Sequence, residues 1–384
     1  MKRVAYSKPD VVIYLYRPGD GGLDRVAILL ANGFAARGLA TEIWLTHNEG
    51  ESRFLIADNV TVRIVTHKRR AKRSSAMLFQ IPSLVQMVRQ YQPRILLSAG
   101  NQSNLATAIA ARLGGRTAAF QKITNPIKRP ETQSGVQWFR NLRFGLTARL
   151  GTKTLVLSQA DANASTALTP DIMHRFIVTP NPYVTDGMLT TGQQRSPRIA
   201  GAVPQMLSVA RFSEQKDHAT LLEALALLKH RAWHLTLVGD GPLRSTIEQQ
   251  VVTLGLSNRV TFAGFIKDPL PFYAASDMLV LSSRWEGLPA TPIESLACGT
   301  MVVATDCAPG LTEMLQDAGL PKPVPIADPA ALAQAIVCAI DDPPCLKRAR
   351  KSAERYSIAS SVEAHLAAFA PWLSPNGVRM INPR

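Results

Sequence analysis

The sequence is poor in features that would mark a membrane-spanning, secreted or metal-binding protein. No run of apolar residues approaches the roughly 18 that a membrane-spanning helix needs. The N-terminal stretch is interrupted by charges and a proline, which is unlike a secretory signal peptide. Cysteine is rare and has neither CxxC nor metal-ligand spacing, with Cys298, Cys307, Cys338 and Cys345 as its four occurrences. We therefore expect reduced thiols, no metal site and a cytoplasmic location.

Acidic residues are scarce in the first half of the chain. The 384 residues include 43 Lys or Arg and 28 Asp or Glu, which gives a formal net charge of +15 at pH 7. Residues 1–190 hold 25 of the basic residues and only 11 of the acidic ones, whereas the remainder is nearly neutral. A basic half favours an anionic partner such as nucleic acid, an acidic membrane surface or a phosphorylated substrate.

Short apolar strands alternate with helical stretches along most of the chain. In the first half the expected strands include DVVIYLY, ATEIWLT, PRILLSA, RTAAFQKI and KTLVLS. In the second half they include MLSVAR, HLTLVGD, RVTFAGF, DMLVLSS and TMVVATD. Because parallel strands need a crossover between them, this alternation predicts βαβ units and an α/β fold with parallel sheets.

A polar segment containing glycine and proline divides this pattern in two. We expect a basic N-terminal Rossmann-like domain at residues 1–190, a linker at 191–205 and a C-terminal Rossmann-like domain at 206–357. Residues 358–384 should form a C-terminal helix and tail that return to the first domain. The two domains would face each other across an interdomain cleft, because ligands of such folds bind beyond the carboxyl ends of the strands.

Two loops at strand ends in the second domain have the chemistry of an anion site. HLTLVGDGP places Gly239, Asp240 and Gly241 between a strand and a helix, where glycines let backbone amides approach a ligand. SVARFSEQKDH places Arg211 and Lys216 just after another strand, and two cations there suit a diphosphate. Each loop also has an ordinary interpretation: a tight βα turn for the glycines, and solvated surface charge for the cations.

Two glutamates stand in the segment RWEGLPATPIESLACGT. Thr291, Pro292 and Glu294 fit an N-cap, a proline at the first helical position and a capping-box glutamate, so Glu294 has a purely structural interpretation. The same placement puts its carboxylate at a strand end, where it could accept two ribose hydroxyls. Glu286 lies one loop earlier, next to Gly287, and has no helix to cap.

The order of these motifs resembles that of a known family. Arg211 with Lys216, the GDGP turn, VTFAGF and EGLPATPIE closely resemble the retaining glycosyltransferases of family four (glycosyl transferases group 1), which have the GT-B fold. GDGGLDRVAILLANGFAARG looks like that family's N-terminal glycine loop and first helix. TDCAPGLTEML, with Gly310 and Glu313, resembles its closing motif. The resemblance is dense over residues 206–314 and looser before residue 190.

The resemblance implies a role for each matching residue. As catalytic residues, Arg211 and Lys216 would hold the diphosphate of a nucleotide-sugar donor and stabilise it as the leaving group, and Glu286 would face the sugar. Glu294 would bind the ribose and Phe265 would cover the base. Other donor-binding residues, near the nucleotide, the phosphates or the sugar, would be Gly21, Gly22, Asn125, Gly239, Asp240, Gly241, Gly287, Leu288, Pro289 and Ala290.

The implied chemistry requires no metal and no cofactor, since the nucleotide-sugar is a co-substrate. Charge shed onto the diphosphate can be taken up by fixed cations and helix-start amides, and the absence of a DxD triplet is consistent with this. One departure concerns the N-terminal domain, where many members have a histidine and this chain has Asn125. Because an amide is no general base, this favours a front-face substitution in which the departing phosphate oxygen accepts the acceptor's proton.

Two basic clusters lie in the first half, THKRRAKR and KRPETQSGVQWFRNLRFGLTARLG. Basic residues beside aromatic ones suit the headgroup region of an anionic bilayer. The alternative is a solvated face over an ordinary core helix. The residues expected at a membrane or acceptor surface are Lys68, Arg69, Arg70, Lys72, Arg73, Trp138, Arg140 and Arg143.

Together these features predict a retaining, metal-independent glycosyltransferase. It would move a hexose, expected from a UDP-sugar, to a glycan or lipid-linked acceptor in lipopolysaccharide, polysaccharide or glycolipid biosynthesis, as a peripheral protein at the inner face of the plasma membrane. One alternative is a nucleotide-sugar epimerase, which would change the sugar without an acceptor. The other is a basic nucleic-acid-binding protein. No helix-turn-helix, zinc-finger, RNP or KH pattern occurs, so no nucleic-acid partner is expected.

Overall fold

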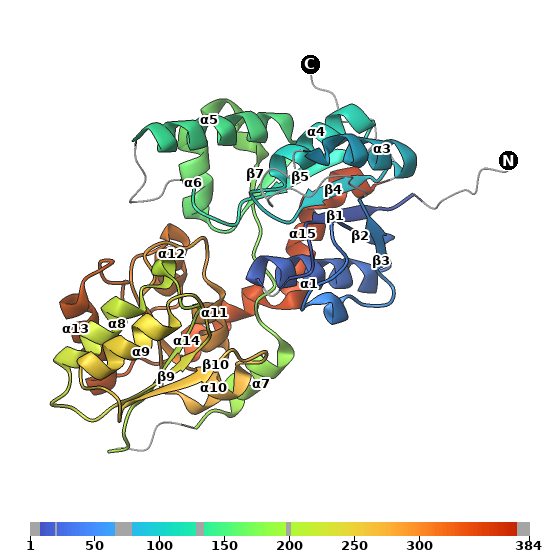
Figure 1. The fold of residues 1–384 in the computed structure, drawn as a ribbon. Coiled ribbons are helices and arrows are strands. Elements are labelled where there is room, and N and C mark those ends of the chain that lie inside the picture. Colours follow the sequence, from blue (N-terminus) through green and yellow to red (C-terminus); the bar gives the residue numbers. More distant parts are fainter. Residues whose placement is uncertain (1–7, 20, 66–78, 128–133, 197–200, 375–384) are drawn as a thin grey trace. The chain divides into compact units, whose positions relative to one another are not determined.

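Two compact α/β units make up the protein (Figure 1), of which the computed structural model describes residues 8–19, 21–65, 79–127, 134–196 and 201–374. One unit comprises Met1–Pro182 with Ile358–Arg384, and the other comprises Tyr183–Ser357. The expected boundary at residue 190 therefore lies inside the second unit. The reason is that helix α7, Asp186–Gln194, packs against helices of that unit, and the expected linker 191–205 begins within this helix.

The first unit contains, among its described residues, a seven-stranded parallel sheet with the order β3-β2-β1-β4-β5-β6-β7. Every residue of β1, β2, β4 and β5 is buried, as is typical of parallel strands covered by helices on both faces. The strands are β1 Val11–Leu15, β2 Thr41–Leu45, β3 Thr61–Ile64, β4 Ile95–Ser98, β5 Ala118–Lys122, β6 Lys153–Val156 and β7 Phe176–Val178. The helices are α1 Gly22–Ala36, η1 Arg53–Leu55, α3 Ile81–Tyr91, α4 Asn104–Gly114, α5 Ser134–Leu150, α6 Gln159–Leu168, η2 Pro170–Arg175 and α15 Ile358–Leu373.

The second unit contains, in its described part, a five-stranded parallel sheet with the order β10-β9-β8-β11-β12. Its strands are β8 Gln205–Val209, β9 His234–Val238, β10 Val260–Gly264, β11 Met278–Leu281 and β12 Met301–Ala304. Besides α7, its helices are η3 Glu214–Lys216, α8 His218–Leu227, α9 Arg244–Thr253, α10 Leu270–Ala275, α11 Ala290–Ala297, α12 Pro309–Asp317, α13 Pro329–Asp341, α14 Lys347–Ala353 and η4 Glu354–Tyr356. The prediction of an α/β fold with two parallel sheets is confirmed.

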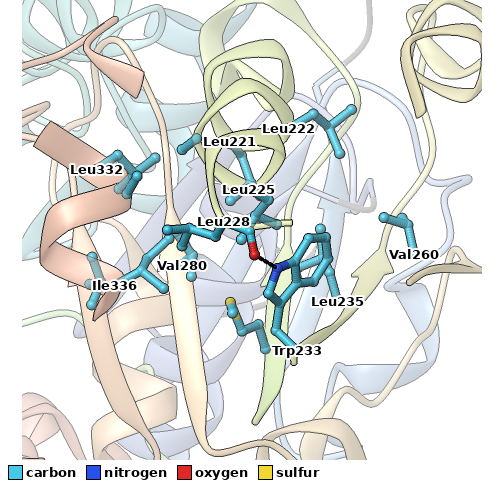
Figure 2. Packing of buried hydrophobic residues seen from close by; sticks show 14 of the residues in the cluster. Leu221, Leu222, Leu225, Leu228, Trp233, Leu235, Val260, Val280, Leu332 and Ile336 are labelled. Atoms are coloured by element: carbon cyan, nitrogen blue, oxygen red, sulfur yellow. Dashed lines mark hydrogen bonds between the residues drawn. The ribbon is translucent and has the colours of Figure 1, made fainter. Parts of the chain in front are cut away.

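The core of the second unit lies between the sheet and helices α8 and α13 (Figure 2). Leu221, Leu225 and Leu332 are fully buried there, and the Trp233 indole donates a hydrogen bond of 2.9 Å to the Leu228 carbonyl. Burial of apolar side chains contributes about 1.5–3 kcal/mol each. This packing fixes the strands whose carboxyl ends carry the loops described next.

In both parallel sheets the order in which strands are added reverses at the first strand. In the first unit the chain runs from β1 outward to β3 and then crosses to β4 on the other side of β1; in the second it runs from β8 to β10 and crosses to β11 beside β8. The loops after the two strands on either side of such a switch point diverge and leave room for a ligand. We therefore expect ligand sites at the loops after β1 and β4 in the first unit, and at the loops after β8 and β11 in the second.

Candidate functional site

The loop after β8 brings Lys216 to the switch point of the second sheet. Buried Phe212 anchors the chain just beyond the strand, and the short helix η3 ends at Lys216. The loop after β11 approaches from the neighbouring strand, and its Arg284 amide donates a 2.8 Å hydrogen bond to the Gln215 carbonyl. Two loops that are far apart in the sequence are thus joined through their backbones.

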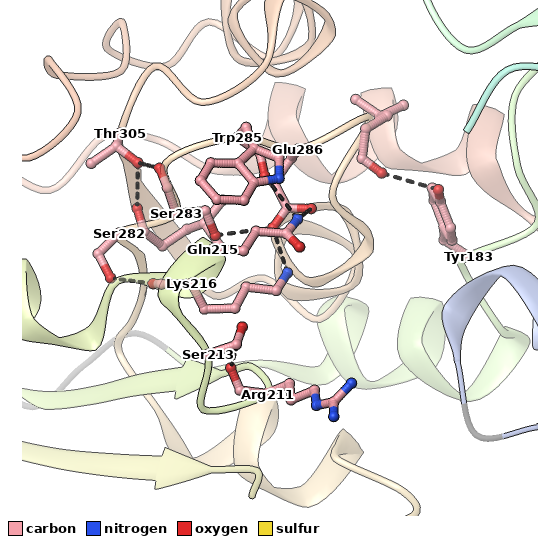
Figure 3. A network of polar contacts seen from close by, with 12 residues as sticks. Tyr183, Arg211, Ser213, Gln215, Lys216, Ser282, Ser283, Trp285, Glu286 and Thr305 are labelled. Atoms are coloured by element: carbon pink, nitrogen blue, oxygen red, sulfur yellow. Dashed lines mark hydrogen bonds and ion pairs between the residues drawn. The ribbon is translucent and has the colours of Figure 1, made fainter. Parts of the chain in front are cut away.

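A polar network connects the side chains of these two loops (Figure 3). The Lys216 ammonium group forms an ion pair with the Glu286 carboxylate. Glu286 also accepts hydrogen bonds from the Ser283 hydroxyl at 3.0 Å and from the Gln215 amide at 3.3 Å. Two of the expected catalytic residues are therefore in contact, and Glu286, only 8% exposed, is held by several donors at once.

Arg211, the third expected catalytic residue, lies in the same loop but outside that network (Figure 3). It is exposed, and its side chain makes no hydrogen bond or ion pair with any residue that the structure describes; its carbonyl accepts a 3.5 Å hydrogen bond from the Ser213 hydroxyl. Its guanidinium group thus keeps all its donors for an external anion.

Glu294 is not part of a capping box. Helix α11 begins at Ala290 with Pro289 as its N-cap, so Thr291 lies inside the helix and Glu294 lies beyond its first turn. The Glu294 carboxylate instead accepts a 2.8 Å hydrogen bond from the hydroxyl of Tyr273, a fully buried residue of α10. The capping interpretation is therefore wrong, because the helix starts earlier than the Thr-Pro pair indicated.

The backbone between the two glutamates is fixed by packing and by one long-range hydrogen bond. Leu288 and Pro289 are buried, whereas Gly287 and Ala290 are partly exposed. The hydroxyl of Tyr183 donates a 3.0 Å hydrogen bond to the Leu288 carbonyl, as Figure 3 also shows. Sequence reasoning missed the contribution of Tyr183, because this residue lies more than 100 residues before Leu288.

The glycines of the GDGP turn are required by close backbone packing. A Cβ atom on Gly239 would lie 2.0 Å from the Ala210 carbonyl oxygen, and one on Gly241 would lie 2.4 Å from that of Phe212. Gly239 also has φ +142°, which L residues rarely adopt. The turn therefore lies against the loop that carries Arg211, and the ordinary structural interpretation of the glycines holds whether or not a ligand also approaches them.

Two further expected residues of the second unit are exposed. Asp240 forms a 3.7 Å ion pair with Arg244 at the start of α9. Phe265 follows β10 and is 66% exposed, which is unusual for a phenylalanine and leaves its ring available to a planar ligand.

The switch point of the first sheet holds a cavity of about 220 Å³. Gly21 and Asn125, both expected at the donor, line it together, whereas Gly22 is exposed next to it. The side chain of Asn101 holds the loop that carries Asn125. Its Oδ1 atom accepts a 2.7 Å hydrogen bond from the backbone amide of Thr124, and its Nδ2 atom donates a 3.2 Å hydrogen bond to the backbone carbonyl of Asn125. Sequence reasoning missed Asn101, although its position after β4 is the signal that could have identified it.

Helix α5 exposes apolar residues over one side. Trp138, Phe139 and Leu142 are each more than half exposed, so the core-helix interpretation does not hold for them. Arg140 donates a 2.9 Å hydrogen bond to the Pro126 carbonyl, and Arg143 is exposed. The expected cluster of Lys68, Arg69, Arg70, Lys72 and Arg73 lies outside the described residues. No described helix is long and apolar enough to cross a membrane.

Comparison with solved structures identifies the fold class. The structure of Anabaena Alr3699/HepE, determined in complex with UDP and glucose, matches with a TM-score of 0.76 over 94% of this chain and 99% of that chain, at 19% sequence identity. The chain therefore has the GT-B fold, in which two Rossmann-like units each carry a parallel sheet.

Comparison of sequences identifies the second unit more closely. Residues 191–356 match the family described as "Glycosyl transferases group 1", so this unit carries a domain of that kind. The lipopolysaccharide core biosynthesis glycosyltransferase LpsE of Rhizobium meliloti is 44% identical over 102 residues, 27% of this chain and 29% of that protein.

A second relative matches over a longer stretch. The N-acetylgalactosamine-N,N'-diacetylbacillosaminyl-diphospho-undecaprenol 4-alpha-N-acetylgalactosaminyltransferase of Campylobacter jejuni is 27% identical over 223 residues, 56% of this chain and 59% of that protein. The matched stretches thus span less than two thirds of the length of either relative.

Proposed function

We propose that this protein is a retaining glycosyltransferase that moves a hexose from a UDP-sugar to a glycan or lipid-linked acceptor of cell-surface polysaccharide, lipopolysaccharide or glycolipid. The observation that carries the proposal is the contact of Lys216 with Glu286 at the switch point of a glycosyl transferases group 1 domain. The names of LpsE and of the Campylobacter relative support the acceptor class, and the UDP and glucose bound to HepE support the donor.

In this proposal the second unit holds the donor without a metal or a cofactor. Arg211, with its free guanidinium group, and Lys216 bind the diphosphate and stabilise the charge it gains as the leaving group. Glu286, positioned by Ser283, accepts hydrogen bonds from sugar hydroxyls, and Glu294 accepts those of the ribose. Because a bound diphosphate is a second anionic partner for Lys216, donor binding would also weaken the ion pair between Lys216 and Glu286.

The acceptor's proton has to go to a group that can take it. The first-unit cavity is lined by amides and hydroxyls, among them those of Asn101, Ser103, Thr124 and Asn125, and by the carboxylate of Asp24. Asn125, which stands where many members of the resembling family have a histidine, is no general base. This supports a front-face substitution, in which the departing phosphate oxygen accepts the proton as the new glycosidic bond forms on the side that the leaving group vacates.

Turnover of nucleotide sugars tests the proposal. Lys216→Ala and Glu294→Ala should each lower UDP release from a UDP-hexose by about 100-fold or more, because each removes a group that contacts the donor. Lys229→Ala, on an exposed lysine after α8, is the matched control and should keep full activity. Full activity of both site variants would remove the site assignment, and incubation with donor alone separates a transferase from an epimerase, since only the epimerase changes the sugar.

We also propose that the exposed side of α5 docks on an anionic membrane, where a lipid-linked acceptor would be found. Trp138→Gln combined with Arg143→Gln should weaken binding to vesicles of phosphatidylethanolamine and phosphatidylglycerol, since both an apolar contact and a charge are lost. Val252→Gln replaces an equally exposed apolar residue of α9 and serves as the control. Equal binding by all three proteins would refute docking through α5.

A further inference from the structure

Asp217, the residue that follows Lys216, has an unusual backbone conformation. Its φ of 47° and ψ of 54° lie in the left-handed region, which costs most L residues roughly 1–2 kcal/mol and is tolerated best by glycine, asparagine and aspartate. The conformation ends η3 at Lys216 and starts α8 at the next residue, His218. Asp217 is therefore the junction between the short helix that carries Lys216 and α8.

The buried carboxylate of Asp217 holds this turn from two sides. It caps α8, accepting from the Thr220 amide at 3.3 Å and from the Thr220 hydroxyl at 2.9 Å. It also accepts a 2.9 Å hydrogen bond from the guanidinium group of Arg284, in the loop after β11. The Asp217 side chain is only 5% exposed, so this ion pair is less screened than a surface pair.

Two ion pairs thus join the same two loops, and each loop supplies the cation of one pair and the anion of the other. Lys216 is paired with Glu286, and its neighbour Asp217 is paired with Arg284, two residues before Glu286. Between them the Ser282 hydroxyl donates a 3.0 Å hydrogen bond to the Lys216 carbonyl. A lysine side chain has four rotatable bonds, so the accuracy with which it meets a phosphate depends on how firmly its backbone is held.

We infer that Asp217, through its ion pair with Arg284, is a positioning residue that holds Lys216 against the diphosphate of the donor. This inference rests on the proposed function, since it assigns Asp217 a role at the same site. Neither Asp217 nor Arg284 needs to touch the ligand. Their effect should therefore be confined to the part of the ligand that Lys216 contacts.

Binding of UDP and of uridine, measured by NMR titration, tests this. Asp217→Asn keeps an acceptor for the helix cap and tolerates the left-handed conformation, but it loses the charge that holds Arg284. It should weaken UDP binding by about 10-fold, the size expected when one charged hydrogen bond is lost, and leave uridine binding unchanged. Arg284→Gln should weaken UDP binding by the same amount, and Arg284→Lys should weaken it less. The double variant that combines Asp217→Asn with Arg284→Gln should lose no more UDP affinity than either single variant, because both substitutions remove the same interaction.

Asp328→Asn is the matched control, because Asp328 caps α13 by accepting from the Ala331 amide at 2.9 Å and is not part of the two-loop network. It should leave both affinities unchanged. If Lys216→Ala weakens UDP binding while Asp217→Asn does not, or if Asp217→Asn weakens uridine equally, the positioning role is overturned and the proposed function stands. If the unaltered protein binds neither UDP nor uridine, the proposed function fails and the positioning role fails with it.

Discussion

Glu286 and Glu294 come from one short segment, but the fold gives their carboxylates different partners. Glu286 faces a cation, Lys216, whereas Glu294 accepts from the neutral hydroxyl of Tyr273. An anionic ligand would compete with Glu286 for Lys216, whereas the Tyr273 hydroxyl that donates to Glu294 carries no charge for such a ligand to compete for. We therefore test Glu286 by ligand affinity and turnover, and the hydrogen bond of Glu294 by unfolding.

Glu286→Gln should separate donor binding from turnover. The amide keeps the size and hydrogen-bonding capacity of the side chain but removes the negative charge that competes with phosphate for Lys216. UDP affinity should therefore be unchanged or higher, whereas transfer from a UDP-hexose should fall about 100-fold or more. Calorimetry and a UDP-release assay measure the two quantities. Loss of UDP affinity as large as that of Lys216→Ala would contradict this assignment.

Tyr273→Phe should destabilise the second unit by about 1–2 kcal/mol, because the buried Glu294 carboxylate loses a hydrogen-bond donor. Urea unfolding measures the change. A double-mutant cycle with Glu294→Gln isolates the pair, and the coupling should be favourable since the two side chains are in direct contact. Additive effects of the two substitutions would show that the hydrogen bond does not contribute to stability.

At the scale of elements, the loops after β8 and β9 pack against each other. The Phe212 amide donates to the Asp240 carbonyl at 3.0 Å, and the Ala210 amide donates to the Val238 carbonyl at 2.9 Å. Gly239 lies between these bonds with no space for a side chain. The position of Arg211 thus depends on a turn that precedes a different helix.

Gly239→Ala should therefore destabilise the second unit by about 2–4 kcal/mol, because it combines a backbone clash with an unfavourable positive φ. Thermal unfolding measures this. Gly135→Ala in α5 is the matched control: a Cβ there meets no atom within 4 Å, and alanine favours the helix, so stability should not fall. Equal melting temperatures for the two variants would contradict the packing argument.

The central strands of both sheets and the edge strands β10 and β12 could be predicted from the sequence because their apolar runs are clear, whereas the edge strands of the first sheet, β3 and β7, could not. The residues of β3 and β7 are partly exposed and their patterns are weak. In the candidate site, the order of residues after strands placed Lys216 and Glu286 together. The Tyr273–Glu294 hydrogen bond and the ion pair of Asp217 with Arg284 depend on side-chain packing between separate elements, for which a single sequence has no signal.

At the scale of the whole molecule, the end of the chain completes the first unit. Phe369 of α15 packs against Phe34 of α1 and Phe120 of β5, with ring centroids 5.6 and 4.6 Å apart. Beside these rings the amino group of the fully buried Lys122 lies 2.8 Å from His365 Nε2. Because His365 Nδ1 lies 2.7 Å from the Ser361 carbonyl and donates to it, Nε2 is the acceptor and Lys122 is the donor.

This lysine should make the stability of the first unit depend on pH. Burial lowers the pKa of Lys122 from 10.5 to about 7. Between these two values the unfolded chain binds a proton that the folded lysine does not, so the free energy of unfolding should rise with pH by up to about 1.4 kcal/mol per pH unit. Below about pH 7 both states are protonated, and above 10.5 neither is, so the contribution is constant outside the window.

Lys122→Met should remove this rise, because methionine has a similar length and no proton to bind. His365 is coupled to Lys122, but burial lowers the pKa of His365 well below 6.5, so it does not titrate within the window. The quantity to measure is the difference in unfolding free energy between the two proteins across that window. Hydrogen exchange of the β5 amides during urea unfolding assigns the change to the first unit. Lys229→Met, on an exposed lysine of the second unit, should keep the slope of the unaltered protein. Parallel pH profiles for Lys122→Met and the unaltered protein would mean that Lys122 stays charged in the folded state, and α15 would then close over a buried cation.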